Sequence, residues 1–82
     1  LNTEIISLYP QPTRHELTIH TRGSIDCSQL NLETIDGKNV KSSCQGSSNE
    51  YRIDVSNLNS GVYLLKYNTK SGHREVHKVI IQ

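Results

Sequence analysis

The stretch 53–67 constrains the fold of this chain more than any other part of the sequence. It holds two runs typical of β-strands, separated by a short polar segment that must turn a sharp corner. Gly61 can adopt the positive φ that such a corner often needs, and Leu58 can fill the corner with an apolar side chain. We expect Tyr63 to bury its ring and turn its hydroxyl back onto the corner backbone, as in a tyrosine corner. The alternative is that Tyr63 is only a large side chain on a half-buried strand.

The rest of the chain is built from similar short runs. In most of them apolar and polar residues alternate, which is typical of a strand with one buried face, and no segment of any length has a helical period. We expect strands at 5–9, 16–21, 29–35, 38–43, 50–55, 62–67 and 74–82. With turn signals about every eight to twelve residues, this predicts an all-β sandwich of about seven short, mainly antiparallel strands. Apolar residues on both faces of 62–67 indicate a central strand covered, at least in part, on both sides.

Two segments should interrupt the strands in different ways. Pro10 and Pro12 lack an N–H donor, so they should end the first strand or confine it to a sheet edge. The segment 45–49 is polar and rich in serine and glycine, and it predicts a surface loop.

Two hairpin turns are also expected. Asp36-Gly37 is the strongest hairpin signal in the chain, and a two-residue turn there would pair Ile35 with Lys38. The segment 68–73 contains a serine followed by glycine and predicts a second hairpin turn before the last strand.

The two cysteines, Cys27 and Cys44, could form a disulfide or stay reduced. In the hairpin register just described, Cys44 faces Gln29, so that both cysteines lie on one face of a sheet and are related diagonally. A small shift or bulge would then bring them within bonding range. Such a bond would contribute about 3 kcal/mol and would imply an oxidising compartment.

Composition limits both the core and the class of partner. The 82 residues include no Phe, Trp or Met, so the core of this single small domain must come from Leu, Ile, Val and four tyrosines. Nine basic and eight acidic residues give a net charge of +1, which removes the main electrostatic reason to expect a nucleic-acid partner. No apolar run approaches the length of a membrane span. The chain lacks an initial Met and a signal-peptide pattern, so we expect a piece of a longer protein.

The sequence offers little sign of a catalytic or metal site. His73 and His77 would lie about 13 Å apart in a strand, too far to share one ion. There is no G-x-S-x-G motif and no glycine-rich phosphate loop, so we expect neither enzymatic activity nor a cofactor. Surface tyrosines could form a glycan platform, but Tyr63, Tyr51 and Tyr67 are needed in the core.

The last five residues, Lys78-Val79-Ile80-Ile81-Gln82, are unusual for a terminal strand. A run of branched apolar residues at an unprotected sheet edge is a liability in a soluble domain. One interpretation is a final strand paired into the sheet, with half of these side chains buried. The other is that the terminal segment is presented to a partner, which could add a strand to it.

The order of these motifs resembles the type A C-terminal sorting domain of the type IX secretion system of Bacteroidetes. The resemblance covers residues 7–82 and is carried by Tyr9-Pro10-Gln11-Pro12, the strand 16–19, Asp36-Gly37-Lys38, then Ser56, Leu58, Gly61 and Tyr63, and the final Lys78–Gln82. The family usually has Asn where this chain has Gln11, and its pattern does not demand the cysteine pair.

The resemblance implies an immunoglobulin-like β-sandwich that serves as an address on a cargo protein. The cargo would fold in the periplasm, and an outer-membrane translocon would recognise the domain. A sortase-like cysteine protease would then cut the linker before the first strand, leaving the cargo on the outer membrane or cell surface, attached to lipopolysaccharide, or secreted. On this basis residues 1–6 are a linker remnant and 7–82 the sorting domain.

The resemblance also assigns residues. Translocon recognition would involve Lys78, Val79, Ile80, Ile81, Gln82, Gly61 and Tyr63. Pro10, Pro12, Asp36, Gly37 and Leu58 would be structural. Exposed edge strands would allow two copies to pair as a dimer. The alternative function is an immunoglobulin-like surface module that binds glycan or protein.

Overall fold

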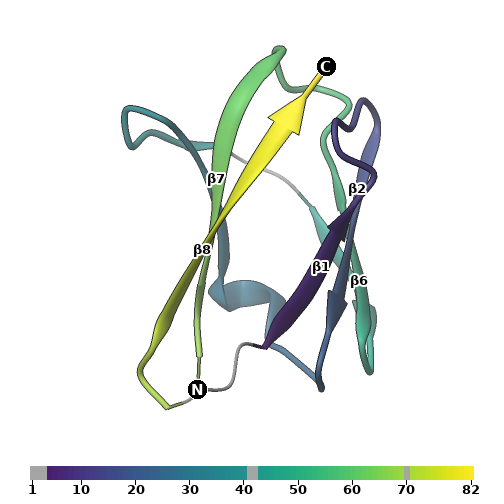
Figure 1. Ribbon diagram of the computed structural model, residues 1–82, viewed down its shortest axis with the longest axis vertical. Coiled ribbons are helices and arrows are strands. Elements are labelled where there is room, and N and C mark those ends of the chain that lie inside the picture. The colour runs from purple at the N-terminus through teal and green to yellow at the C-terminus, as the bar shows by residue number, and fades with distance from the viewer. Residues whose placement is uncertain (1–3, 41–42, 70) are drawn as a thin grey trace.

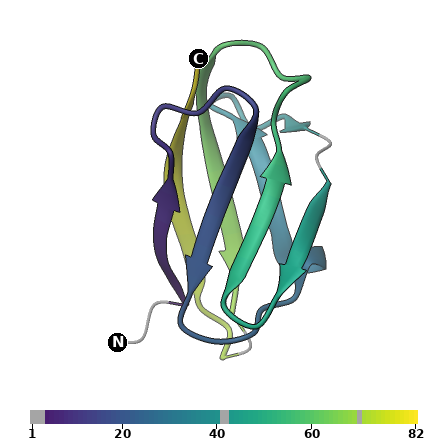
Figure 2. The same ribbon diagram turned by 90° about the vertical axis from the view of Figure 1, so that its right-hand side faces the viewer.

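The computed structural model describes residues 4–40, 43–69 and 71–82, and in this part of the chain it contains eight strands and one short 3₁₀ helix. The elements are β1 (Ile5–Tyr9), β2 (Glu16–Thr21), η1 (Cys27–Gln29), β3 (Leu30–Thr34), β4 (Asn39–Val40), β5 (Cys44–Ser47), β6 (Glu50–Asp54), β7 (Gly61–Asn68) and β8 (Arg74–Ile81). They form two four-stranded antiparallel sheets, in the orders β1-β2-β6-β5 and β4-β3-β7-β8, which we call sheet A and sheet B. Figures 1 and 2 show the two layers face to face. The predicted all-β sandwich is confirmed.

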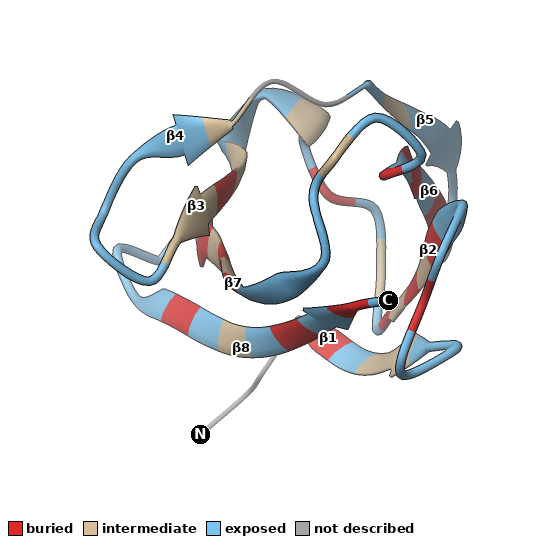
Figure 3. Ribbon diagram, turned by 90° about the horizontal axis from the view of Figure 1, so that it is seen from above, coloured by how far each residue is buried: buried red, intermediate tan, exposed pale blue. Residues whose placement is uncertain are grey.

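The core lies between the two sheets and follows the alternation seen in the sequence. Buried residues recur at every second position of β2 and β6, and β8 follows the same alternation except at the half-buried His77, as Figure 3 shows. The buried apolar residues are Ile5, Leu17, Ile19, Ile25, Leu32, Tyr51, Ile53, Val55, Tyr63, Leu65, Tyr67, Val79 and Ile81. Because Tyr51, Tyr63 and Tyr67 are among them, tyrosine takes the place of the missing Phe and Trp, as expected.

The strand 62–67 is central, as expected, but one of its two faces is covered only in part. β7 is central in sheet B, with β3 on one side and β8 on the other. Its outward residue Val62 is nevertheless 41% exposed, and Leu64 is only half-buried. The two apolar faces therefore reflect one core face and one open outer face.

The hairpin at Asp36-Gly37 has a different register from the one predicted. The turn closes at Thr34 and Lys38, with Thr34 N–H donating to Lys38 O at 2.8 Å, and Ile35 becomes an exposed loop residue. Gly37 N–H donates to Thr34 O at 3.0 Å, and Gly37 has a φ of 93°, so the loop has three residues rather than two. The pairing is consequently displaced by one residue.

The second hairpin, at 69–73, repeats the same turn and confirms the prediction there. Thr69 N–H donates to His73 O at 2.8 Å, and Gly72 N–H donates to Thr69 O at 3.1 Å. In both hairpins the threonine hydroxyl also accepts the N–H of the closing residue, Lys38 or His73, at 3.0 Å. A threonine three residues before a glycine therefore defines both turns of sheet B.

The predicted surface loop at 45–49 is largely a strand. β5 pairs with β6 through Cys44, Gln45, Gly46 and Ser47 and forms the edge of sheet A. The strand was not predicted because its residues are mostly polar and show no alternation of apolar and polar side chains. Gly46 lies so close to β6 that a Cβ there would collide with Glu50 O and stand 2.6 Å from Tyr51 Cα.

Cys27 and Cys44 are bonded in the structure, with their Cα atoms 5.8 Å apart. The predicted diagonal arrangement on one sheet is wrong, because Cys27 lies in η1, which leads into sheet B, and Cys44 lies in β5 of sheet A. The bond therefore links the two layers rather than two strands of one hairpin. Positions 41–42 of the predicted strand 38–43 lie outside the described residues.

Candidate recognition surface at the C-terminal strand

The predicted recognition residues lie on two neighbouring strands, except Gln82, which directly follows β8. β7 and β8 pair along their whole lengths, with Gly61 opposite Ile81 and Tyr63 opposite Val79. The structure thus brings together residues that are separated in the sequence.

Their side chains, however, point in two directions. Val79 and Ile81 are buried in the core, whereas Lys78, Gln82 and the 39% exposed Ile80 reach solvent. Only the second group offers side chains that a partner could touch without unfolding the strand.

Tyr63 forms the predicted tyrosine corner, which confirms that interpretation. Its ring is 7% exposed, and its hydroxyl donates to Asn59 O at 2.7 Å across the corner between β6 and β7. Leu58 is half-buried and packs against the core, and Gly61 has a φ of 155°. The contacts of Tyr63 explain a structural role in the link between the two sheets.

The outer face of sheet B carries an apolar patch beside the last residues. Val62 lies opposite Ile80, and Leu64 lies opposite Lys78. Val76, two residues before Lys78, is also exposed. We call these five residues the outer-face patch. Lys66, two residues after Leu64 on β7, forms an ion pair with Glu33 at 2.9 Å. The patch is therefore bordered by a charged region.

The outer face of sheet A is different. Arg52 lies near Glu16 at 3.9 Å and pairs with Glu50 at 3.1 Å, while Thr18 and His20 occupy the neighbouring outward positions of β2. An apolar partner surface would therefore prefer sheet B to sheet A.

The free edge of β8 is not unprotected near its end, which corrects the sequence-based view of this strand. The Gln11 side chain donates from Nε2 to Lys78 O at 2.9 Å and accepts Ile80 N–H on Oε1 at 3.0 Å. Thr13 N–H then donates to Ile80 O at 2.9 Å, and Gln82 N–H donates to Thr13 O at 2.7 Å. We call residues 11–13 the strap. Its Gln11 amide replaces a peptide group of a neighbouring strand.

The sequence pattern did not point to Gln11 or Thr13 as functional residues. Pro10 and Pro12, in contrast, were predicted to end the first strand, and they follow β1 directly. Both are preceded by cis peptide bonds. The only local sign of the strap in the sequence was Gln11 itself, a long amide side chain between two prolines.

One histidine contacts a carboxylate of its own strand. His77 Nε2 lies 3.1 Å from Glu75 Oε1, and both side chains belong to β8. Within residues 4–40, 43–69 and 71–82, no group of three potential metal ligands comes together. No helix in the same part of the chain is both long enough and apolar enough to cross a bilayer.

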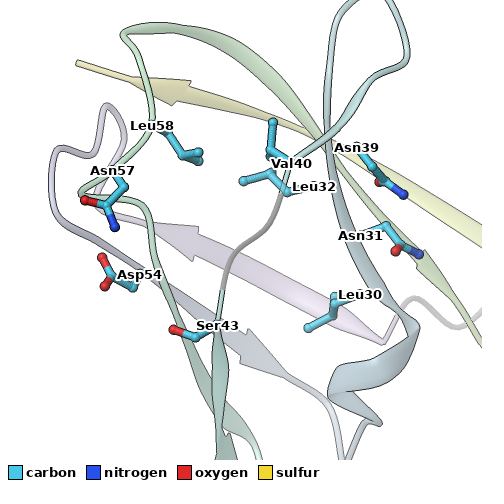
Figure 4. A pocket seen from close by; sticks show the side chains of 9 residues that line it. All are labelled: Leu30, Asn31, Leu32, Asn39, Val40, Ser43, Asp54, Asn57 and Leu58. Atoms are coloured by element: carbon cyan, nitrogen blue, oxygen red, sulfur yellow. The ribbon is translucent and has the colours of Figure 1, made fainter.

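The glycan platform receives little support from the tyrosines. Three of the four rings are in the core, and the exposed Tyr9 lies on β1. A groove of about 740 Å³ does open between the sheets on the other side of the sandwich (Figure 4). Its apolar wall includes Leu32, Val40 and Leu58, and Asp54 lies at its polar side. A groove of this kind could accept a mixed polar and apolar group.

One polar group of this groove is already engaged. Ser56 donates to Asp54 Oδ1 from its hydroxyl at 2.6 Å and from its N–H at 2.9 Å. These two hydrogen bonds, and then the nearby His15, lower the pKa of Asp54 below its ordinary value. The Asp54 carboxylate therefore stabilises the turn that leads into the corner.

Together, these observations describe a small β-sandwich with an exposed apolar patch on one outer face. The chain matches the family model of the secretion system C-terminal sorting domain over residues 7–82. It belongs to that family, the C-terminal sorting domains of type IX secretion, whose members act as sorting signals. Such a role suggests a non-catalytic module that interacts with the secretion system on the way to the outer membrane, the cell surface or secretion.

Two further comparisons bear on the fold. No curated protein matches the chain significantly. Among solved structures, the chain is similar to CopC from Methylosinus trichosporium OB3b, with a TM-score of 0.61 and 17% sequence identity, covering 95% of this chain and 91% of that one. At this identity the similarity shows the shared β-sandwich and nothing further.

Proposed function

We propose that the type IX translocon reads this domain through the outer-face patch and the exposed members of its last residues. The observation that carries the proposal is the outward row Lys78 and Ile80 on β8, next to Val62 on β7. This row combines one cation with an apolar surface at the end of the chain, and exposed apolar patches commonly mark protein interaction sites. Gly61 and Tyr63 then contribute by holding the corner beside the patch.

The buried members of the final segment act indirectly. Val79 and Ile81 anchor β8 in the core, so that Ile80 and Lys78 are held outward by the alternation of the strand. Deleting the final five residues would therefore remove core and surface together. A surface substitution is the sharper test.

The proposal includes processing and delivery. A sortase-like cysteine protease cuts upstream of the first strand, and the cargo is attached to the cell surface after passing through the periplasm. β1 begins at Ile5, so we place the cut before that residue. The bond between Cys27 and Cys44 is compatible with passage through an oxidising compartment.

Self-association, the last part of the proposal, is restricted by the shape and the cover of the edge strands. The pairing of β1 with β2 is irregular between Ile5 and Ser7, and the strap occupies the end of β8. Bulges and covered edges oppose strand addition. Val76 is an exposed apolar residue of the edge strand β8, and pairing of two copies there would be detected by light scattering of the purified domain.

The proposal is tested by delivery of a passenger protein fused before the domain in a type IX secreting bacterium. We expect Ile80→Ser to reduce the passenger at the cell surface while the domain stays folded, because Ile80 is partly exposed and outside the core. Ile6→Ser is the matched control, since it removes the same apolar group from the exposed edge strand β1.

Two outcomes would contradict the proposal. One is full delivery with Ile80→Ser combined with Lys78→Glu, and the other is an equal loss with Ile6→Ser. Thermal unfolding of each purified variant excludes a trivial loss of folding. Sequencing the amino terminus of the released domain would test whether the cut lies before Ile5.

A further inference from the structure

Glu75 makes contacts that link the last strand to the first described residues of the chain. Its side chain is 8% exposed, in a chain whose other charged residues are largely at the surface. Oε2 accepts Glu4 N–H at 2.6 Å, and Oε1 accepts Ile5 N–H at 3.3 Å. His77 Nε2 lies 3.1 Å from Oε1. A buried carboxylate needs such donors, because without them its desolvation would be costly.

The same two residues are held by sheet A from the other side. Arg22 N–H donates to Glu4 O at 2.7 Å, and Ile5 lies opposite Thr21 in β2. The ladder is then interrupted, because the register of β1 and β2 shifts between Ile5 and Ser7. The start of an edge strand beside such a bulge has few backbone bonds of its own and is prone to fray. Glu75 supplies bonds at this point.

We propose that Glu75 is the positioning residue that fixes where the folded domain begins, and that it thereby sets the first residue a processing protease cannot reach. This inference rests on the proposed function, since it assumes that the domain is cut from a cargo. Proteases bind their substrates as extended segments, with the substrate backbone free to pair with the enzyme. With both N–H groups held by Glu75 and the Ile5 side chain in the core, Glu4 and Ile5 cannot enter such a cleft without local unfolding.

The first experiment measures hydrogen exchange of the wild-type chain. We expect the Glu4 and Ile5 amides to exchange much more slowly than those of an unstructured peptide, because both N–H groups are bonded. Exchange at the unstructured rate would overturn the proposal before any variant is made.

The second experiment uses Glu75→Gln in the chain with a passenger at its amino terminus, treated briefly with a protease of broad specificity. A glutamine keeps the size of the side chain, but its NH₂ group cannot accept an N–H and faces one of the two donors. We expect roughly tenfold faster exchange of the Glu4 amide, as lost bonds to a charged acceptor imply, with new cuts at 4–9. The core amides of Leu17 and Ile19 should keep their protection.

Glu33→Gln is the matched control, because Glu33 also pairs with a basic side chain on sheet B but lies on β3, which is separated from β8 by β7. It should leave the first protected residue unchanged. If Glu75→Gln does not fold, Glu75→Asp keeps the charge and shortens the reach by one methylene, and it should show the same shift. A folded variant of either kind with the wild-type cleavage boundary would overturn the proposal.

The cellular arm separates this inference from the proposed function. In a secreting strain, Glu75→Gln should move the amino terminus of the released domain downstream of its wild-type position. If the wild-type domain fails to deliver its passenger, the proposed function fails, while the exchange and protease results still decide whether Glu75 fixes the boundary. If delivery is normal and the terminus does not move, the proposed role of Glu75 in processing fails alone.

Discussion

At the scale of single residues, Gln11 shows how one side chain can act as a piece of β-sheet. Its amide has the same donor and acceptor as a peptide group, and it contacts Lys78 O and Ile80 N–H on the free edge of β8. The end of this edge is thereby covered without a further strand.

Replacing Gln11 with Ala tests this role. We expect the Ile80 amide to exchange roughly tenfold faster, because one hydrogen bond to an edge N–H is lost while β7 still pairs with β8. Gln45→Ala, on the edge strand β5, is the control and should leave Ile80 unchanged. Unaltered protection of Ile80 in the Gln11 variant would show that the side chain does not hold the edge.

Tyr63 offers a second test at this scale. Tyr63→Phe keeps the buried ring and removes the hydrogen bond to Asn59 O, so it should lower the free energy of unfolding by about 1 kcal/mol. Tyr63→Ala should cost about 3–5 kcal/mol, because the core loses a large aromatic ring. Urea denaturation measures both, with Tyr9→Phe as the exposed control. Equal midpoints for wild type and Tyr63→Phe would exclude an energetic role for the corner bond.

At the scale of elements, the turns and the edge strand depend on backbone shape more than on apolar pattern. The two hairpins of sheet B share the hydrogen-bond pattern set by Thr34 with Gly37 and by Thr69 with Gly72. β5 depends in a similar way on Gly46, whose φ is 144°. Each glycine acts where a side chain would be strained or would collide.

Gly46→Ala is therefore expected to destabilise the pairing of β5 with β6. The added methyl group would meet the backbone of Glu50 and Tyr51, which cannot move without opening the sheet edge. We expect a loss of roughly 2–4 kcal/mol, combining backbone strain with overpacking. Gly23→Ala is the control, since nothing lies within 4 Å of the place that its new methyl group would take and its φ is not in the positive range. Similar denaturation midpoints for both variants would contradict the close approach.

Acid should weaken two of these turns. The Thr34 hydroxyl, the Asp36 N–H and Lys38 lower the pKa of Asp36, as the Ser56 bonds lower that of Asp54. A lowered pKa in the folded state means that the stabilisation is complete above the ordinary value of 3.8 and is lost as pH falls through the folded pKa. Carbonyl NMR titration should give both midpoints below 3.8. Midpoints at or above that value would contradict the two turn assignments.

At the scale of the whole molecule, the two sides of the sandwich are closed by different means. On one side Glu75, Gln11 and Thr13 connect β8 to the start of the chain. On the other side the bond between Cys27 and Cys44 joins the layers next to the open groove. The first side depends on hydrogen bonds between distant segments, and the second on a covalent link.

Removal of the disulfide should consequently be felt by the whole domain. The double variant Cys27→Ser with Cys44→Ser should lose about 3 kcal/mol of unfolding free energy, because the bond closes a loop with a sequence separation of 17. Guanidinium denaturation with and without reductant measures this loss. Reductant should destabilise the wild type and leave the double variant unchanged. A wild type insensitive to reductant, with both thiols shown to be free, would contradict the expectation.

The features that could be predicted from the sequence are those that depend on a local pattern of residues. Alternation placed Leu17, Ile19 and Ile53 in the core, and the Leu58-Gly61-Tyr63 set identified the corner. The order of the motifs identified the family. These features depend on residues that are close together in the chain, so their pattern is visible in the sequence.

Other features could not be predicted, for physical reasons that differ. An Asp-Gly pair fits a hairpin loop of two residues or of three. In this chain the loop has three residues, and the Thr34 hydroxyl accepts the Lys38 N–H across it. β5 has no apolar face to reveal it. The contacts of Glu75 and Gln11 join residues 67 to 71 positions apart, and no local period encodes such pairs.

The arrangement of the first and last strands has a mechanical consequence. β1 and β8 run in the same direction on neighbouring edges of the sandwich, with the start of β1 towards the bottom and the end of β8 towards the top in Figure 1. Tension between the two ends would pull along these strands, so the bonds from β8 to β7, to Glu4 and to the strap would bear the load together. Such a domain should resist stretching between the start of β1 and the end of β8 far better than peeling from one side.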